Sequence, residues 1–477
     1  MGRLDPDAAG HDDDPEGDVE EDHVEEDDVP EREPMRCIVV VPVSTQRSPA
    51  RAHRTEAGPN GERPKPALHA PHDRLEEAVG LARAIDLEIT ESLIAPLAAP
   101  RPSTLLGKGK VEEIGTLAKQ RGAGLIIVDH ALSPIQQRNL EKLWGAKVID
   151  RTGLILEIFG RRAATREGRL QVELAHLSYQ KSRLVRSWTH LERQRGGAGI
   201  LGGPGESQLE LDRRLIQDRI DSLKKDLAQV VRTRDLHRKG RARVPYPVVA
   251  IVGYTNAGKS TLFNRLTGAA VLAKDQVFAT LDPTMREVRL PSGRRVILSD
   301  TVGFISDLPT TLVAAFRATL EEVVTADLIV HVRDISHAES AAQRNDVLAV
   351  LASLDIEGLE STRQPLEVWN KIDRLEPSAR DEAEQIARRT DPLPQLISAV
   401  TGDGLAGLLA AIDGRLGGRD EIVELTVPAS AGKLTHWLHE NTEVLAREPS
   451  DTGDTRYRVR IGAGHKARLE AQVKRLG

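Results

Sequence analysis

The segment GYTNAGKST at 253–261 constrains the fold of this chain more than any other part of the sequence. It fits the pattern GxxxxGK followed by Ser or Thr, whose fixed positions are held by Gly253, Gly258, Lys259 and Ser260. The apolar run Pro247 to Val252 comes directly before it, and the helix-like run Thr261 to Leu266 follows. This order predicts a strand, a loop whose N–H groups turn onto phosphate oxygens, and a helix N-terminus. We expect Lys259 to reach the β and γ phosphates and the Ser260 hydroxyl to ligate Mg²⁺.

A second motif, DTVGF at 300–304, closes another apolar strand, Val296 to Ser299. Its place at a strand end predicts that the Asp300 carboxylate lies near the metal ion and binds it through a water molecule. Gly303 follows three residues later, so its N–H is expected near the γ-phosphate. Together the two motifs predict a site for a nucleoside triphosphate with Mg²⁺.

The third motif, NKID at 370–373, follows the strand Leu366 to Trp369 and selects the base. The Asp373 carboxylate can accept hydrogen bonds from the N1–H and the exocyclic amine of guanine, a donor pair that adenine lacks. Asn370 would hold the base and its loop, and the stem of Lys371 would cover the ring. Backbone contacts would complete the pocket from Ser398 and Ala399, just after the strand that ends at Leu396. Three motifs in this order predict a GTP site.

Length and composition limit the other possibilities. At 477 residues the chain is too long for one ordinary core, and its length suggests about three domains. Cys37 is the single cysteine, which excludes a disulfide framework and favours a reducing cytosol. No apolar stretch approaches the roughly 18 residues of a membrane helix, and the N-terminus is acidic rather than a basic signal sequence. We expect a cytoplasmic monomer without a membrane span.

The net charge of −6 conceals a strong asymmetry along the chain. Residues 1–35 carry a net charge of −14 and few hydrophobic side chains, so we expect a disordered acidic tail. Residues 161–243 carry a net charge of +10, as expected for binding a phosphate backbone, although solvated helix faces give similar counts. In one interpretation the tail competes with RNA for this basic segment, and in the other it has no such role.

Strand and helix patterns alternate before the nucleotide motifs and predict a small α/β unit over 36–160. Its expected strands are Cys37 to Val41, Glu88 to Leu93, Gly124 to Asp129 and Lys147 to Asp150, and its expected helices are Arg74 to Ile85, Val111 to Gln120 and Ile135 to Trp144. Residues 247–418 should form a P-loop domain with a mostly parallel sheet and helices on both faces. A small α+β domain over 420–477 should place the helix Lys433 to Leu445 between the strands Glu421 to Val427 and Arg456 to Ile461.

Apolar residues at three- and four-residue spacing predict two long helices, Arg166 to Leu191 and Glu206 to Asp235. The apolar positions of the second are Leu209, Leu215, Ile216, Ile220, Leu223, Leu227 and Val230. Helices of this length should pack as an antiparallel hairpin over 161–243. The glycine-rich loop at its tip, residues 195–205, is either a linker or a contact surface that orders on binding. The segment LLGKGKVEEI at 105–114 is likewise either a plain turn before a helix or an anion site.

Several further segments stand out: LLGKGKVEEI, DRTGLILEIF at 150–159, WTHLERQRGG at 188–197, GGPGESQLELDRR at 202–214, and FATLDPT at 278–284 together with DTVGF. Together these segments resemble the HflX family of translational GTPases. The resemblance covers residues 37–420 and does not include the acidic tail. Leu201, Gly202 and Gly203 stand where many members of the family have an arginine in the glycine-rich loop, so a role of that arginine is not carried over.

The resemblance implies a GTP-hydrolysing factor that binds the large (50S) ribosomal subunit, with its hairpin near the peptidyl-transferase region of the rRNA. Such factors dissociate stalled or idle ribosomes under heat or other stress. Thr280 would be the second Mg²⁺ ligand. At position 304, where many GTPases have a water-orienting glutamine, this chain has Phe304, so hydrolysis is expected to be slow alone and stimulated by ribosomes. Asn256 would either hold a K⁺ ion beside the phosphates or serve only the geometry of the turn.

We expect Lys259, Thr280 and Gly303 to be catalytic. The expected nucleotide-binding residues are Gly253, Tyr254, Thr255, Asn256, Ala257, Gly258, Lys259, Ser260, Thr261, Phe278, Ala279, Thr280, Leu281, Asp282, Asp300, Thr301, Val302, Gly303, Asn370, Lys371, Ile372, Asp373, Ser398, Ala399 and Val400. Two other functions stay open at this point. One is GTP-dependent assembly of the large subunit without splitting, and the other is ATP-assisted remodelling of rRNA through the N-terminal region.

Overall fold

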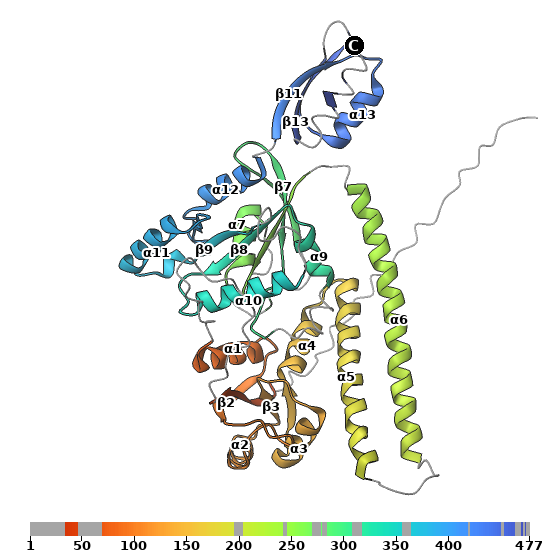
Figure 1. Ribbon diagram of the computed structural model, residues 1–477, viewed down its shortest axis with the longest axis vertical. Helices are drawn as coiled ribbons and strands as arrows, with labels where there is room; N and C mark the ends of the chain where they lie inside the picture. Colours follow the sequence, from red (N-terminus) through yellow and green to blue (C-terminus); the bar gives the residue numbers. More distant parts are fainter. Residues whose placement is uncertain are drawn as a thin grey trace, which may run out of the picture. The chain divides into compact units, whose positions relative to one another are not determined.

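A computed structural model describes residues 34–45, 69–194, 204–241, 246–269, 278, 284–307, 317–354, 364–417, 420–449, 453–462, 469–470 and 473 (Figure 1). The chain divides into two units, Met1–Pro34 and Met35–Gly477. The predicted acidic tail therefore falls almost entirely outside the described residues, as does the loop at the tip of the predicted hairpin.

The first sheet is parallel and has the strand order β2-β1-β3-β4. Its elements are β1 (Arg36–Ser44), α1 (Pro71–Arg83), β2 (Glu88–Leu97), α2 (Lys108–Arg121), β3 (Leu125–Val128), α3 (Pro134–Trp144), β4 (Lys147–Asp150) and α4 (Arg151–Arg162). Alternate residues of β1 and β3 enter two different hydrophobic clusters, one with α1 and α4 and the other with α2 and α3. Helices therefore cover both faces, which explains the uninterrupted apolar runs of β1 and β3. The predicted α/β pattern is confirmed, whereas α4 was not predicted from periodicity.

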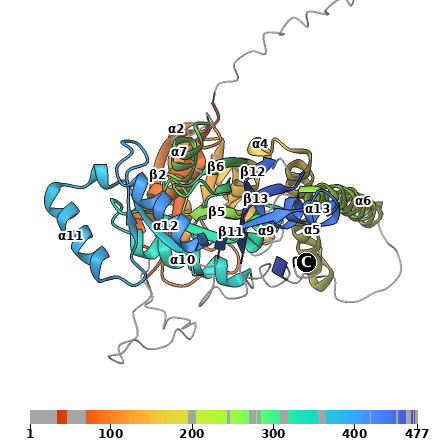
Figure 2. The same ribbon diagram turned by 90° about the horizontal axis from the view of Figure 1, so that it is seen from above.

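Two long helices follow, α5 (Arg166–Gln194) and α6 (Pro204–Arg241), and both views show them side by side (Figures 1 and 2). Glu173 pairs with Arg219 at 2.7 Å, and Lys181 contacts Gln217, so the helices run antiparallel, as predicted. Ile220 and Leu223 of α6 are buried, but Leu215 is 58% exposed. Adjacent residues of a helix point about 100° apart, so Leu215 and Ile216 cannot both face α5.

The nucleotide motifs lie on a second sheet, with the strand order β10-β9-β8-β5-β7-β6. Its strands are β5 (Val248–Gly253), β6 (Thr284–Arg289), β7 (Arg295–Asp300), β8 (Leu328–Asp334), β9 (Leu366–Asn370) and β10 (Gln395–Leu396). Among the described strands of this sheet, β6 and β7 pair antiparallel and the other pairings are parallel, so the sheet is mostly parallel, as predicted. The accompanying helices are α7 (Lys259–Thr267), α9 (Arg317–Thr325), α10 (Ser340–Ser353), α11 (Pro377–Arg389) and α12 (Leu405–Gly417), with a short helix η1 (Ile372–Arg374). Because the carboxyl ends of parallel strands meet at one edge, the three motifs come together there.

The last sheet is antiparallel, with the order β11-β13-β12, and the helix α13 packs against it. Its elements are β11 (Asp420–Val427), α13 (Gly432–Asn441), β12 (Glu443–Pro449) and β13 (Thr455–Gly462). The prediction that the helix extends to Leu445 was wrong. The helix ends at Asn441, and Val444 instead pairs with Val459 in the sheet, because a β-branched residue gains more from that half-buried position.

Candidate functional site

The phosphate-binding loop lies between β5 and α7, as the motif predicts. A side chain at Gly253 would place its Cβ 2.2 Å from the Val332 carbonyl oxygen, and one at Gly258 would place it 2.3 Å from Asn370 Nδ2. Gly258 also has φ of +91°, a conformation that side chains rarely adopt. Glycine is therefore required at both positions because the loop approaches β8 and the NKID motif closely.

Lys259 begins α7 and is buried, and its Nζ donates a hydrogen bond to the Tyr254 carbonyl oxygen at 2.7 Å. The ammonium group thus lies against the backbone of the loop that would hold the phosphates. Burial lowers the pKa of Lys259 to about 8, against the opposing effect of the Asp300 carboxylate. A phosphate anion beside this amine would favour its charged form, which is the role expected of the lysine.

The donor atoms expected for Mg²⁺ are adjacent. Ser260 Oγ donates a hydrogen bond to Asp300 Oδ2 at 2.7 Å, and Asp300 is fully buried at the end of β7. The described residues contain no group of three or more His, Cys, Asp or Glu side chains suited to a metal. In nucleotide sites Mg²⁺ usually takes one or two protein oxygens and completes its shell with phosphate and water. Ser260 and Asp300 would hold the ion, while Thr280 lies outside the described residues.

Two backbone hydrogen bonds of Phe304 hold the segment next to Gly303 against the phosphate loop. The Thr255 N–H donates to the Phe304 carbonyl oxygen at 2.7 Å, and the Phe304 N–H donates to the Gly253 carbonyl oxygen at 3.1 Å. A Cβ on Gly303 would lie 2.8 Å from Thr255 Cγ2 and 3.0 Å from Lys259 Nζ. The backbone at Gly303 is therefore directly beside the amine that would bind the γ-phosphate.

The Phe304 ring cannot orient a water molecule, and it is also buried among apolar side chains. Its side chain is 1% exposed and belongs to the hydrophobic cluster that includes α1 and α4. Phe278 belongs to the same cluster and meets Phe159 edge to face, with ring centroids 4.7 Å apart. The ring contact with Phe159 thus joins Phe278 to α4, and Phe304 lies in the same cluster.

The guanine motif is joined to the phosphate loop through Asn370. Its Nδ2 donates to the Ala257 carbonyl oxygen at 2.8 Å, and its Oδ1 accepts from the Ala399 N–H at 3.0 Å. Ser398 is fully buried and accepts a hydrogen bond from the Thr401 N–H at 3.1 Å. Asp373 lies exposed in η1, where its carboxylate is accessible to a base.

Sequence reasoning missed Asp334, at the end of β8. Its Oδ2 accepts from Lys371 Nζ at 2.6 Å, while Oδ1 accepts from the Ser336 N–H and hydroxyl. The Lys371 Cε also lies 4.0 Å from the Cβ position of Gly258. The ion pair therefore holds the lysine stem across the face where the base would lie. A carboxylate ending a parallel strand beside the guanine motif was the signal that could have identified it.

The other predicted residues fall into three groups. Thr301 and Val302 are buried, and Thr301 Oγ1 donates to the Ile251 carbonyl oxygen at 2.7 Å. Asn256 is exposed with φ of +63°, and Val400 is 67% exposed. The described residues also include Thr261 on α7 and the buried Ile372 of η1, whereas Ala279, Leu281 and Asp282 lie outside them.

No described helix is both long and apolar enough to span a membrane. The long helices α5 and α6 are amphipathic and rich in charged residues.

The sequence is similar to known proteins along most of its length. Family models match residues 72–160 (GTP-binding GTPase N-terminal), 162–241 (GTP-binding GTPase Middle Region), 248–371 (50S ribosome-binding GTPase) and 384–477 (HflX C-terminal domain). The chain is 50% identical to the GTPase HflX of Magnetococcus marinus, covering 87% of this chain and 94% of that protein. It is 43% identical to the GTPase HflX of Escherichia coli, covering 81% and 89%.

A solved structure, described as the complex of SsGBP with GDP, is 23% identical and covers 79% of this chain and 97% of that chain, with a TM-score of 0.44. The family models and the identity to curated relatives over most of both chains agree with the nucleotide site built above. The chain therefore belongs to the HflX family of GTPases.

Proposed function

We propose that this protein uses GTP to associate with the large ribosomal subunit and to dissociate stalled or idle ribosomes under heat or other stress. The observation that carries the proposal is the match of residues 248–371 to a model described as a 50S ribosome-binding GTPase. These residues contain the phosphate loop, Asp300, Gly303 and Asn370 in one connected site. The same site supplies a nucleotide-dependent step for binding and release.

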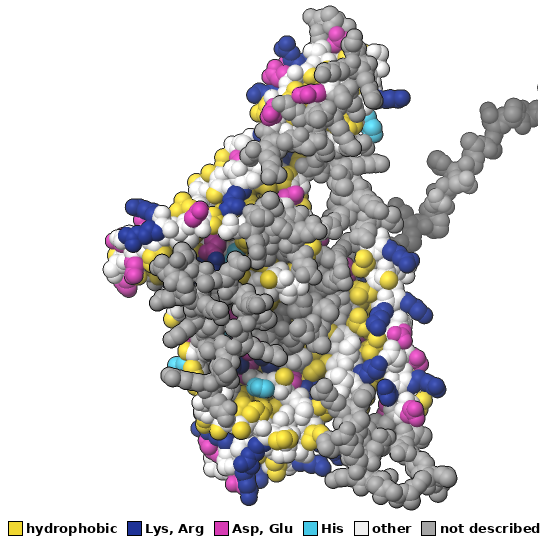
Figure 3. All heavy atoms as spheres, viewed as in Figure 1, with side chains coloured by type: hydrophobic (Ala, Val, Ile, Leu, Met, Phe, Trp, Pro, Cys, Tyr) yellow, Lys and Arg dark blue, Asp and Glu magenta, His cyan; other side chains and the backbone are white. Residues whose placement is uncertain are grey.

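The helical hairpin is the part that would contact rRNA. Residues 161–243 carry a net charge of +10. On the described part of α6 the exposed basic residues are Arg213, Arg214, Arg219, Lys224, Lys225 and Arg232, interspersed with acidic ones (Figure 3). Leu211 and Leu215 are also exposed, at 54% and 58%, and lie one turn apart on α6. Cationic and apolar groups on one helix suit a surface of phosphates and bases.

The hairpin is firmly attached to the first sheet. Asp150 is buried at the N-terminus of α4 and accepts hydrogen bonds from Tyr179 Oη at 2.5 Å and from Arg183 Nη2 at 2.6 Å. Both donors lie on α5. A displacement of α5 would therefore also move the N-terminus of α4, because these hydrogen bonds join the two helices.

At the nucleotide, Lys259 would bind the β and γ phosphates, Gly303 would donate its N–H to the γ-phosphate, and Asp373 would select guanine. Ser260, Thr280 and Asp300 would hold Mg²⁺, which neutralises phosphate charge when it is bound. A K⁺ ion at Asn256 is a separate proposal, and the left-handed backbone of Asn256 equally suits the turn alone. Comparing hydrolysis in K⁺ and in Na⁺ tests it, and equal rates would dismiss the ion.

Sucrose gradients test the proposal directly. Intact ribosomes with GTP and the parent chain should yield separate subunits. A chain whose residues 196–205 are replaced by a Gly/Ser loop of equal length should bind GTP but fail to split ribosomes. Lys259→Ala should fail because it does not bind GTP. Co-migration with large subunits without splitting would instead support an assembly factor, and splitting driven by ATP alone would support the ATP-assisted alternative.

A further inference from the structure

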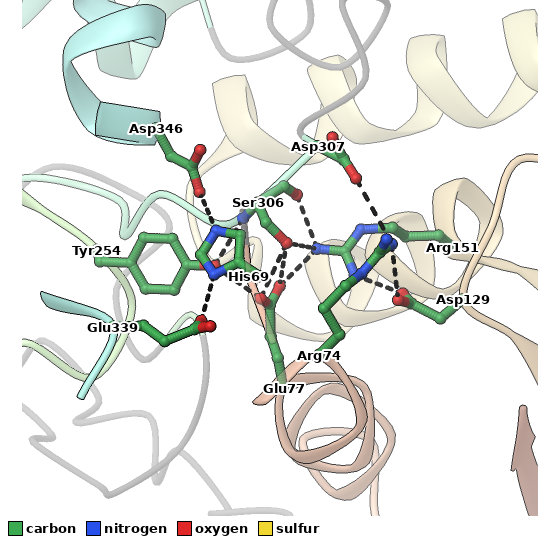
Figure 4. Close-up of polar contacts among 10 residues, drawn as sticks. All are labelled: His69, Arg74, Glu77, Asp129, Arg151, Tyr254, Ser306, Asp307, Glu339 and Asp346. Atoms are coloured by element: carbon green, nitrogen blue, oxygen red, sulfur yellow. Dashed lines mark hydrogen bonds and ion pairs between the residues drawn. The ribbon is translucent and has the colours of Figure 1, made fainter. Parts of the chain in front are cut away.

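Two side chains from the helices that cover the N-terminal sheet contact the nucleotide-binding region. Glu77 lies on α1 and Arg151 is the first residue of α4. Figure 4 shows both pointing at Ser306, which lies three residues after Gly303. None of the three motifs contains these residues, and sequence reasoning assigned them no role.

Glu77 bridges the phosphate loop and the segment that carries Gly303. The Tyr254 hydroxyl donates to Glu77 Oε2 at 2.6 Å, and the Ser306 hydroxyl donates to the same oxygen at 2.9 Å. The bridge closes on itself, because the Ser306 N–H donates to the Tyr254 hydroxyl oxygen at 2.8 Å. The carboxylate therefore fixes the separation between residue 254 of the loop and residue 306.

Arg151 holds the same segment from the other side. Its Nη2 donates to the Ser306 carbonyl oxygen at 2.7 Å and the hydroxyl oxygen at 3.0 Å, and it pairs with Glu77 at 2.5 Å. Its Nη1 pairs with Asp129, at the end of β3. Ser306 and Arg151 are both 4% exposed, so little water competes for these contacts. Buried charge-assisted hydrogen bonds of this kind are the stronger class.

These contacts bear on the place where the γ-phosphate would lie. Residues 301–305 connect Asp300 to Ser306, and Gly303 stands in the middle with Lys259 Nζ beside it. The backbone pairing of Tyr254 with Phe304 fixes one side of Gly303, and Ser306 fixes the segment beyond it. The Gly303 N–H is thus placed before any phosphate arrives, which is how prearranged donors lower a barrier.

We propose that Glu77 and Arg151 are positioning residues for GTP hydrolysis, acting through Ser306 to hold the Gly303 N–H at the γ-phosphate. The inference rests on the role proposed for Gly303 and does not depend on the ribosomal partner. With this role, residues of the N-terminal helices α1 and α4 support the hydrolytic site. GDP has no γ-phosphate, so GDP binding should not require the bridge.

The test measures the single-turnover hydrolysis of GTP by the full chain in parallel with its affinity for mant-GDP and its melting temperature. Glu77→Gln leaves one acceptor oxygen where Tyr254 and Arg151 use both oxygens of the carboxylate, and Ser306→Ala removes the other end of the bridge. Each variant should hydrolyse GTP about tenfold more slowly, since small misplacements of a reacting group cost at least that much. Affinity for mant-GDP should stay within about twofold. The double variant should be no slower than the slower single one, because both break one bridge.

Tyr179→Phe is the matched control. It also removes a hydroxyl donor from a buried carboxylate, but the Tyr179 hydroxyl donates its hydrogen bond to Asp150 rather than to Glu77 or Ser306. Its hydrolysis rate should equal that of the parent. Parent-like or faster hydrolysis by Glu77→Gln and Ser306→Ala would overturn the inference, and so would an equal loss of mant-GDP affinity. Gly303→Ala separates the two proposals: a parent-like rate in that variant refutes the role of Gly303 itself.

Discussion

Restoring the glutamine that many GTPases have at position 304 should not restore fast hydrolysis in this protein. The Phe304 side chain is 1% exposed within a hydrophobic cluster, and its backbone is paired to the phosphate loop. In Phe304→Gln the amide would be buried among apolar groups rather than placed beside the γ-phosphate. We expect a hydrolysis rate no higher than that of the parent.

The same change should destabilise the fold. Truncating a buried phenylalanine to alanine costs about 3–5 kcal/mol, and burying an amide without a partner costs roughly 1–3 kcal/mol. Glutamine keeps part of the lost volume, so we expect a net loss of about 3 kcal/mol, or a melting temperature lower by roughly 6–12 °C for a domain of this size. Phe304→Leu, which keeps the site apolar, should cost less than about 1.5 kcal/mol.

Thermal unfolding and single-turnover hydrolysis check both statements on the same samples. A Phe304→Gln variant that melts with the parent and hydrolyses GTP faster would refute the reasoning, because it would show that side chain 304 reaches the reacting water. A variant that melts early but gains rate would refute only the statement about orientation.

Three further predictions concern the nucleotide pocket. Burial lowers the pKa of Lys259 to about 8 from 10.5, so between these values the folded, nucleotide-free protein binds fewer protons than the unfolded chain and its stability should rise with pH. GDP binding at pH 9 should then take up a proton, which calorimetry in buffers of different ionisation enthalpy would reveal; an enthalpy independent of buffer would contradict it. Asp334→Asn should release mant-GDP about tenfold faster in stopped flow by freeing Lys371, since a hydrogen bond to a charged group is worth about 1.5–3 kcal/mol, whereas the control Asp346→Asn should not. Gly258→Ala should weaken mant-GDP binding by at least about tenfold, because its Cβ would meet Asn370 Nδ2 at 2.3 Å, and unchanged affinity would disprove the contact.

Much of the fold followed from local pattern. The apolar runs of β1 and β5 and the spacing of α5 and α6 predicted their elements because burial imposes periodicity on the chain itself. The end of α13 was misplaced because the apolar pair Val444 and Leu445 suits either a helix or a strand, and only the pairing of this segment with β13 selects the strand. The helix α4 was not predicted because it begins at Arg151, directly after the last residue of β4, so no loop residues mark the boundary in the sequence.

The sequence by itself determined the nucleotide pocket. Phosphate loop, metal ligand and guanine motif each depend on a few consecutive residues after a strand, and parallel strands bring their ends to one edge. Only the tertiary structure decided what surrounds that pocket. Phe304 faces the hydrophobic cluster, and Glu77 and Arg151 meet Ser306 across 229 and 155 residues of sequence. Such contacts depend on how the helices of the first sheet pack against the nucleotide-binding sheet. The spacing of residues within one segment carries no information about that packing.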